Sequence, residues 1–285
     1  MINIYGTRYH FHPFFIFIIF TSILAGNVGE LLTLFSIVFI HEMGHVVAAK
    51  FFGWDVKSVQ LLPFGGVAEV ETHRNTSAKE EIIVAIAGPF QNFWMIGIVF
   101  FLQKIEIVDP IWSSYFIEAN LMIALFNLLP ILPLDGGKIV QAMLSFKLSF
   151  HRSLKYCGWH SFIMSLLLIG YACMHMISSG VHLNLMMIGI FLLYTNWYYL
   201  RNSPFYFIKF LMRREFTFSL RKTKPSIKPI TAQPSSSLSE IVKSFKRDQL
   251  HVIYVINDFG KIQAMIPEEQ IIKTYLSNPN SKNRK

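Results

Sequence analysis

The stretch Ile37–Ala49 reads IVFIHEMGHVVAA and places two histidines and a glutamate inside an apolar segment. Eight of the ten residues in 31–40 are Leu, Ile, Val or Phe, which favour insertion into a bilayer by roughly 2.5–5 kcal/mol on the biological scale. One ionised residue at the centre of a span costs about 2.5–3.5 kcal/mol on the same scale. Glu42 therefore needs a partner or a water-filled cavity.

The spacing of the two histidines indicates that this partner is a metal ion. His41 and His45 are four residues apart, so a helix stacks them on one face. Two such imidazoles can reach one metal ion at the usual Zn–N distance of about 2.0–2.1 Å. Glu42 lies about 100° round the helix, where it can accept a proton from the attacking water, as in the H-E-x-x-H pattern. We expect Gly44 to keep the helix surface low and leave room for a peptide backbone.

A catalytic zinc site usually has three protein ligands and one open position, so a further ligand is needed. The candidate lies in FNLLPILPLDGGKIV, residues 126–140. Asp135 follows a long apolar run and is bracketed by prolines and glycines that break the helix, so its short side chain can turn toward a neighbouring span. The alternative is a plain helix stop with a loop aspartate. The need for a third ligand favours Asp135 in the metal site.

The composition indicates an α-helical polytopic membrane protein. Of 285 residues, 53% are hydrophobic and 15% are charged, whereas soluble domains carry about a quarter charged residues. A span needs about 17–25 apolar residues, and the runs of suitable length are 9–26, 31–52, 82–102, 112–130, 161–179 and 183–200. The first run could instead be a signal peptide. Six spans with both termini in the cytoplasm put nine of the ten Lys and Arg of residues 1–200 on the inside, as the positive-inside rule favours.

A short β element is predicted between the second and third spans. Residues 56–72 read VKSVQLLPFGGVAEVET, and their alternation predicts two strands joined by the PFGG turn. The element is either a plain cytoplasmic hairpin or a re-entrant segment that lines a water-filled cavity. Because a strand can pair its backbone with an extended peptide, we expect Phe64, Gly65 and Gly66 to contact substrate.

The C-terminal part carries the basic charge of the chain. The whole chain has a formal net charge of +9. Residues 201–285 hold 16 Lys and Arg against 6 Asp and Glu. We therefore predict a membrane domain at 1–205, a basic juxtamembrane linker at 206–228 and a cytoplasmic domain with its tail at 229–285. The linker either lies against an anionic leaflet or is merely solvated. Nucleic acid is not an expected partner.

The last segment has the pattern of a soluble α/β domain. Ser237 and Glu240 have capping-box spacing, residues 251–256 and 261–266 read as strands, and Pro267 opens a second helix. This order resembles a single cystathionine-β-synthase-type (CBS) domain. The resemblance implies ATP as a ligand. It also implies either a homo-oligomer that pairs two such domains or an incomplete nucleotide site.

Three blocks resemble the site-two protease family of zinc-dependent intramembrane proteases. They are HEMGH at 41–45, AGPFQNF at 87–93, and Asn127 together with LDGG at 134–137. In that family the two His and the Asp bind zinc and the Glu is the base, in agreement with the roles above. The family often has Asn-Pro before Asp-Gly, where this chain has Pro133-Leu134, so the backbone turn differs. The resemblance implies that Asn127 and Pro133 hold or align substrate.

The CBS-like tail narrows the resemblance to family members that act in sporulation. It implies that the substrate is the inhibitory pro-sequence of a membrane-associated sigma factor, pro-sigma-K. It further implies membrane-protein inhibitors or regulators. The expected location is the membrane around the forespore, with the site facing the mother-cell cytoplasm.

Two alternatives differ from this interpretation. A transporter or channel with a regulatory CBS-type tail would spread titratable groups over several spans at similar depth, whereas here they cluster at 41–45 and 135. A membrane-tethered metalloprotease that acts on soluble peptides would take its third ligand from a soluble Glu or His. No helical acid pair after residue 45 is suited to that role.

Overall fold

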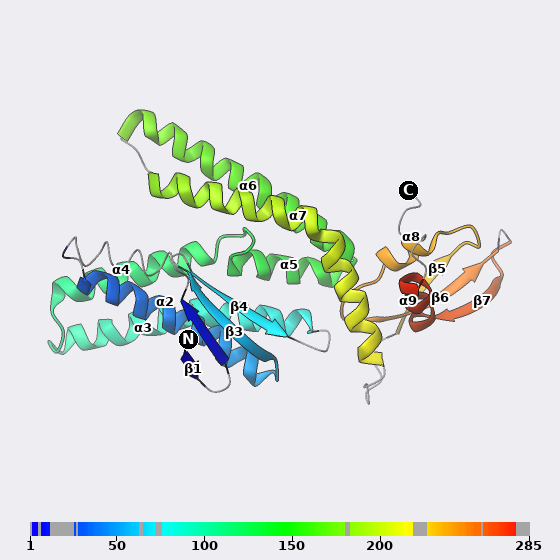
Figure 1. The fold of residues 1–285 in the computed structure, drawn as a ribbon, viewed down its shortest axis with the longest axis horizontal. Coiled ribbons are helices and arrows are strands. Elements are labelled where there is room, and N and C mark those ends of the chain that lie inside the picture. The colour runs from blue at the N-terminus through cyan, green and yellow to red at the C-terminus, as the bar shows by residue number, and fades with distance from the viewer. Residues whose placement is uncertain are drawn as a thin grey trace. The chain divides into compact units, whose positions relative to one another are not determined.

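The computed structural model describes residues 2–4, 7–11, 26, 28–62, 65–71, 76–179, 183–218, 227–257 and 259–277 (Figure 1). The chain divides into two compact units. Unit 1 comprises Met1–Thr72, Lys79–Pro130 and Leu134–Ile139. Unit 2 comprises His73–Ala78, Ile131–Pro133 and Val140–Lys285.

Unit 1 contains a sheet in the order β1-β2-β3-β4. Its strands are β1 (Ile2–Ile4), β2 (Thr7–Phe11), β3 (Asp55–Leu62) and β4 (Gly65–Glu71). Strands β3 and β4 pair antiparallel with Leu62 opposite Gly65, which confirms the two predicted strands. Strand β2 pairs parallel with β3, so residues 9–11, expected at the start of the first span, are strand instead. Residues 12–25 of that span and Phe64 lie outside the described residues.

Three helices of unit 1 correspond to predicted spans. They are α2 (Val28–Phe51), α3 (Ala78–Lys104) and α4 (Pro110–Asn127). Ile37 of α2, Met95 of α3 and Ala119 of α4 are buried against one another, so one apolar cluster joins the three helices. Helix α4 begins where the Asp109 carboxylate accepts the backbone N–H groups of residues 111 and 112, which have no partner inside the helix.

The predicted helix break before Asp135 is present. Helix α4 ends at Asn127, and α5 (Asp135–Lys147) begins at the aspartate itself. The intervening residues form turns, and the Leu132–Pro133 peptide bond is cis. Asp135 therefore lies in the first turn of a new helix, at the end of an irregular segment.

In unit 2, α6 (Phe150–Ser179) and α7 (Leu183–Phe218) run side by side (Figure 1). Two fully buried side chains on these helices hold Leu132 in the segment before Asp135. The Ser161 hydroxyl accepts the Leu132 N–H at 2.9 Å, and Asn196 Nδ2 donates to the Leu132 carbonyl at 2.6 Å. Both backbone groups of this buried residue are thus satisfied without regular secondary structure.

The C-terminal part of unit 2 contains a sheet in the order β5-β6-β7, with β5 parallel to β6. Its elements are β5 (Ile227–Ala232), α8 (Leu238–Lys243), β6 (Leu250–Ile256), β7 (Ile262–Pro267) and α9 (Glu268–Ser277). The Ser237 side chain caps α8 by accepting the Glu240 N–H, as its spacing predicts. Strand β5 was not predicted. Pro267 ends β7 rather than opening α9, which begins one residue later.

Helix α7 extends through Phe218, well into the segment predicted as linker. Phe207, Phe210 and Leu211 of this extension are buried in one core with Phe245 and Ile253 of the C-terminal domain. Their spacing of three and four residues forms an apolar helix face, while charged residues occupy other positions. Packing of this face keeps the segment helical through Phe218, while the predicted domain and linker boundaries stay a prediction.

Three helices of the described part are long and apolar enough to cross a membrane. They are Val28–Phe51, Ala78–Lys104 and Phe150–Met174. These correspond to the second, third and fifth predicted spans. Helices α4 and α7 occupy the positions of the fourth and sixth, so the helical, membrane-type fold is confirmed, whereas the count of six spans stays a prediction.

Candidate metal centre

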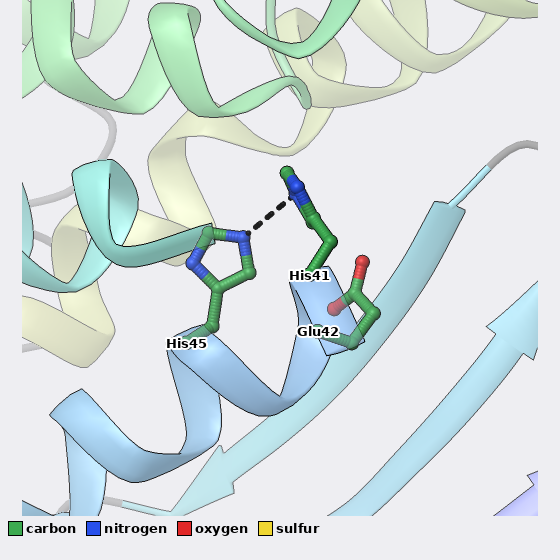
Figure 2. A group of neighbouring side chains, drawn as sticks. All are labelled: His41, Glu42 and His45. Atoms are coloured by element: carbon green, nitrogen blue, oxygen red, sulfur yellow. Dashed lines mark hydrogen bonds between the residues drawn. The ribbon is translucent and has the colours of Figure 1, made fainter. Parts of the chain in front are cut away.

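Helix α2 buries His41, Glu42 and His45 in unit 1. Figure 2 shows the two imidazoles turned toward each other, with Glu42 beside them. One nitrogen or oxygen atom from each of the three residues lies within 4.8 Å of the others, which is close enough for them to share an ion. The structure thus brings together the three polar groups of the H-E-x-x-H motif.

Asp135 joins the two histidines from the start of α5. Its Oδ2 lies 3.2 Å from Nε2 of His41 and 3.0 Å from Nε2 of His45. The two Nε2 atoms are themselves 3.2 Å apart. The three atoms therefore form a nearly equilateral triangle, built from residues 94 positions apart in the chain.

The outer nitrogens of both rings have fixed partners. His41 Nδ1 lies 2.6 Å from Oδ1 of Asn92, whose own amide donates to the Asn120 carbonyl and so orients the oxygen toward the ring. His45 Nδ1 lies 2.7 Å from the Val84 carbonyl oxygen. Because both partners are acceptors, both Nδ1 atoms carry the proton. In a neutral imidazole this leaves Nε2 with a free lone pair.

With both imidazoles neutral, three lone pairs point at one another, an arrangement that a cation among them would stabilise. Tetrahedral zinc bonded at about 2.0–2.1 Å places its ligand atoms roughly 3.3–3.4 Å apart. The observed separations of 3.0–3.2 Å are close to that value. The donor set therefore fits zinc. The other carboxylate oxygen of Asp135 accepts from Lys138 Nζ at 3.0 Å, so both of its oxygens are oriented.

Glycine at position 88 in α3 leaves the space in which the facing edges of the two imidazoles lie. A Cβ there would lie 2.7 Å from Nε2 of His41 and closer still to the His45 ring. Gly44 lies against α3. A Cβ at 44 would meet the Ala87 carbonyl oxygen at 2.6 Å, so this glycine lets α2 and α3 approach closely, while its predicted role beside substrate stays a prediction.

The residues predicted to contact substrate lie in several places. Asn127 is the last residue of α4, and its amide donates to the carbonyl of Ile123 one turn earlier at 3.0 Å. Pro133 is exposed on the segment before α5. Gly65 and Gly66 begin β4 opposite Leu62 and Leu61 of β3.

Sequence reasoning missed Asn92, Val84 and Gly88 as parts of the site. An amide in the apolar run AGPFQNF was a signal, because a buried polar side chain needs a partner. That signal could not name His41 as the partner, because 51 residues separate the two. A backbone carbonyl such as that of Val84 leaves no sequence signal at all.

The fold and the site together define a class of membrane metalloprotease. The pattern of Peptidase family M50 matches residues 29–108 and 103–170. The structure resembles the Site-2 Protease from Methanocaldococcus jannaschii, with a TM-score of 0.56 at 26% identity, over 70% of this chain and 94% of that one. The chain belongs to peptidase family M50 and is a zinc metalloprotease of the site-2 protease type.

Two individual proteins are similar to this chain in sequence. The chain is 32% identical to Stage IV sporulation protein FB of Bacillus subtilis (strain 168), over 95% of this chain and 92% of that protein. It is 35% identical to Zinc metalloprotease MJ0392 of Methanocaldococcus jannaschii, over 50% of this chain and 43% of that protein. These similarities confirm the predicted family and enzyme class.

Proposed function

We propose that His41, His45 and Asp135 bind the zinc ion and that Glu42 is the catalytic base. The observation that carries this proposal is the triangle of three lone-pair atoms 3.0–3.2 Å apart. Burial of all four side chains supports it, because a buried carboxylate and two oriented imidazoles are costly without a cation. The proposed reaction is hydrolysis of a peptide bond within or near the membrane.

Each residue of the site has a separate proposed role in hydrolysis. Bound zinc supplies a Lewis acid that activates water and polarises the scissile carbonyl. Glu42, beside the metal ligands, takes the proton of the attacking water and delivers it to the leaving amine. Asn92 and the Val84 carbonyl keep both histidines in the tautomer that presents Nε2. A helical substrate must unwind locally, because its carbonyls are otherwise hydrogen-bonded along the helix axis.

Strand β4 supports a proposal for how the unwound substrate is held. In the sheet order β1-β2-β3-β4 it stands at an edge and pairs with β3 on one side. An extended peptide could add to such an edge by main-chain hydrogen bonds. We place Phe64, Gly65 and Gly66 at the start of this contact, with Asn127 and Pro133 as further aligning residues. Cross-linking of substrate to β4 would support this role, and unchanged turnover after a proline substitution within β4 would remove it.

The proposed substrate is the inhibitory pro-sequence of a sporulation sigma factor, pro-sigma-K. Support comes from the similarity to a sporulation protein along nearly the whole chain, including the C-terminal domain. For the same reason we propose membrane-protein inhibitors or regulators as partners and a multi-pass arrangement of six spans with both termini cytoplasmic. The proposed location is the membrane around the forespore, facing the mother-cell cytoplasm.

The C-terminal domain is the proposed regulatory part. Its order β5-α8-β6-β7-α9, with β5 parallel to β6, supports the CBS-like interpretation. We propose that it binds ATP and that two chains pair through it. Isothermal titration of the full chain with ATP, together with its mass in detergent, tests both parts.

Co-expression tests the catalytic proposal most simply. Wild type and Glu42→Gln are each produced with a pro-sigma factor, and cleavage is followed by the size of the substrate. We expect cleavage by wild type and none by the variant, with equal zinc content in the two purified proteins. Equal cleavage at equal zinc content would overturn the assignment of the base.

A further inference from the structure

One buried arginine of α7, Arg214, binds the loop Lys246–Gln249 of the C-terminal domain. Arg214 Nη1 donates to the Lys246 carbonyl at 2.6 Å and to the Arg247 carbonyl at 3.1 Å, and Nη2 donates to the Gln249 carbonyl. The same guanidinium pairs with the buried carboxylate of Glu268. Three carbonyls held by one side chain give this loop a fixed backbone, although it is neither helix nor strand.

Two side chains of the same loop hold the start of α3. The guanidinium of Arg247 donates to the Thr76 carbonyl at 2.9 Å and to the Thr76 hydroxyl at 2.7 Å. Arg247 and Thr76 are both buried, so this is an internal contact of unit 2. The Asp248 carboxylate accepts the Ala78 N–H, with its two oxygens 3.1 and 3.3 Å from the nitrogen.

Ala78 is the first residue of α3. The first N–H groups of a helix have no partner inside it, and an acidic group there is also favoured by the helix dipole. Asp248 therefore caps α3 from a position 170 residues further along the chain. Six residues after Ala78, less than two turns into the same helix, the Val84 carbonyl fixes the ring of His45.

We propose that the Lys246–Gln249 loop couples the C-terminal domain to the metal centre, with Arg247 and Asp248 as positioning residues. Asp248 holds the first residue of α3 and Arg247 holds Thr76 two residues before it, and the continuous helix carries that constraint to the Val84 carbonyl and so to His45. Any ligand or partner that shifts this loop would then alter zinc binding without touching the site. The last step rests on the proposed role of His45 as a zinc ligand, whereas the capping of α3 does not.

Hydrogen–deuterium exchange of the purified full chain in detergent tests the cap directly. In Asp248→Ala and Arg247→Ala, we expect the amides of residues 78–84 to exchange roughly three- to tenfold faster than in wild type, since one stabilising contact of the helix start is lost. Asp248→Asn keeps an acceptor that caps helices well, so its exchange should stay close to wild type. Lys261→Ala, a charge-removing change at an exposed turn of the same domain, should leave these amides unchanged.

Zinc affinity, measured by competition with a chelator, tests the second step. We expect Asp248→Ala and Arg247→Ala to bind zinc roughly two- to fivefold more weakly, a smaller loss than direct partners of the ligands give. Asp248→Asn and Lys261→Ala should match wild type. The conservative variant separates a positional effect from a general loss of folding.

The outcomes are distinguishable. Unchanged exchange at residues 78–84 in both alanine variants would overturn the proposal as a whole. Faster exchange with unchanged zinc affinity would overturn the link to His45. If wild type itself bound no zinc, the proposed function would fail, while the exchange result would still decide whether the loop caps α3.

Discussion

The metal centre of unit 1 and the Arg214–Glu268 cluster of unit 2 are both buried polar sites, yet they are built in opposite ways. In the cluster, donors meet acceptors. Glu268 Oε2 accepts from Arg214 Nη2 at 3.0 Å and from the His251 N–H at 2.8 Å. In the metal centre, the two Nε2 atoms and the Asp135 oxygen face one another, and all three are acceptors when both imidazoles are neutral.

This difference separates a structural site from a functional one. In the Arg214–Glu268 pair, opposite charges meet directly, so the pair needs no further ion and fixes the fold around it. A set of converging lone pairs is incomplete without a cation, because each would otherwise lose its water without a replacement partner. The C-terminal cluster should therefore be insensitive to chelators, and the site in unit 1 should depend on its metal.

The largest expected effect separates catalysis from metal binding inside unit 1. Glu42→Gln removes the proposed base, and loss of a general base typically costs about 10²–10⁴ in rate. Zinc content should stay at one ion per chain, because Glu42 is beside the ligand triangle. Glu118→Gln, an exposed glutamate of α4, should leave cleavage unchanged. Proteolysis and zinc analysis check both, and loss of zinc in Glu42→Gln would make Glu42 a ligand.

The next effect tests the space between the ligands. In Gly88→Ala the new Cβ would enter the gap where His41 and His45 face each other, so we expect loss of zinc and of proteolysis. Gly97→Ala in the same helix is the matched control, since a Cβ there meets nothing within 4 Å. Zinc bound equally by the two variants would contradict the geometry of the centre.

A smaller effect tests the orientation of one ligand. Asn92→Leu removes the acceptor of His41 Nδ1–H and should weaken zinc binding roughly 10- to 100-fold, as is typical for partners of metal-bound histidines. Asn202→Leu is the control, because the exposed Asn202 amide donates to the Tyr198 carbonyl of its own helix. Competition with a chelator measures the zinc affinity of both variants. Equal affinities in Asn92→Leu and Asn202→Leu would show that Asn92 does not orient His41.

These residues also show where prediction from sequence reaches its limit. The motif at 41–45 and the helix break around Asp135 could be predicted because their chemistry is local: ligand spacing on one helix, and prolines and glycines that end another. The strand pair of residues 56–72 and the cap at Ser237 follow from local patterns in the same way.

What the sequence could not supply depends on distant partners. Strand β2 pairs with β3 across some fifty residues, and its residues 9–11 read equally well as the start of the apolar run that follows them. Asn92, Val84 and Gly88 matter only because α3 lies against α2. The extension of helix α7 depends on the apolar core that it shares with residues such as Phe245 and Ile253, and composition alone does not reveal that packing.

The smallest expected effect belongs to unit 2. Ser237→Ala removes the cap of α8 and should lower the free energy of unfolding of the C-terminal domain by about 0.5–2 kcal/mol, with zinc content unchanged. Ser235→Ala, at an exposed position nearby, should have little effect. Chemical denaturation of the two variants, followed by circular dichroism, measures both free energies of unfolding. A loss of zinc in Ser237→Ala would contradict the distinction between a structural region in unit 2 and a metal-dependent site in unit 1.

X-ray absorption at the zinc edge of the active, purified protein tests the central claim most directly. Two imidazole nitrogens and one carboxylate oxygen predict a shell of nitrogen and oxygen at about 2.0–2.1 Å, with imidazole outer-shell scattering and no sulfur. A sulfur shell at about 2.3 Å, or scattering without imidazole, would contradict the assignment of His41, His45 and Asp135 as the ligands.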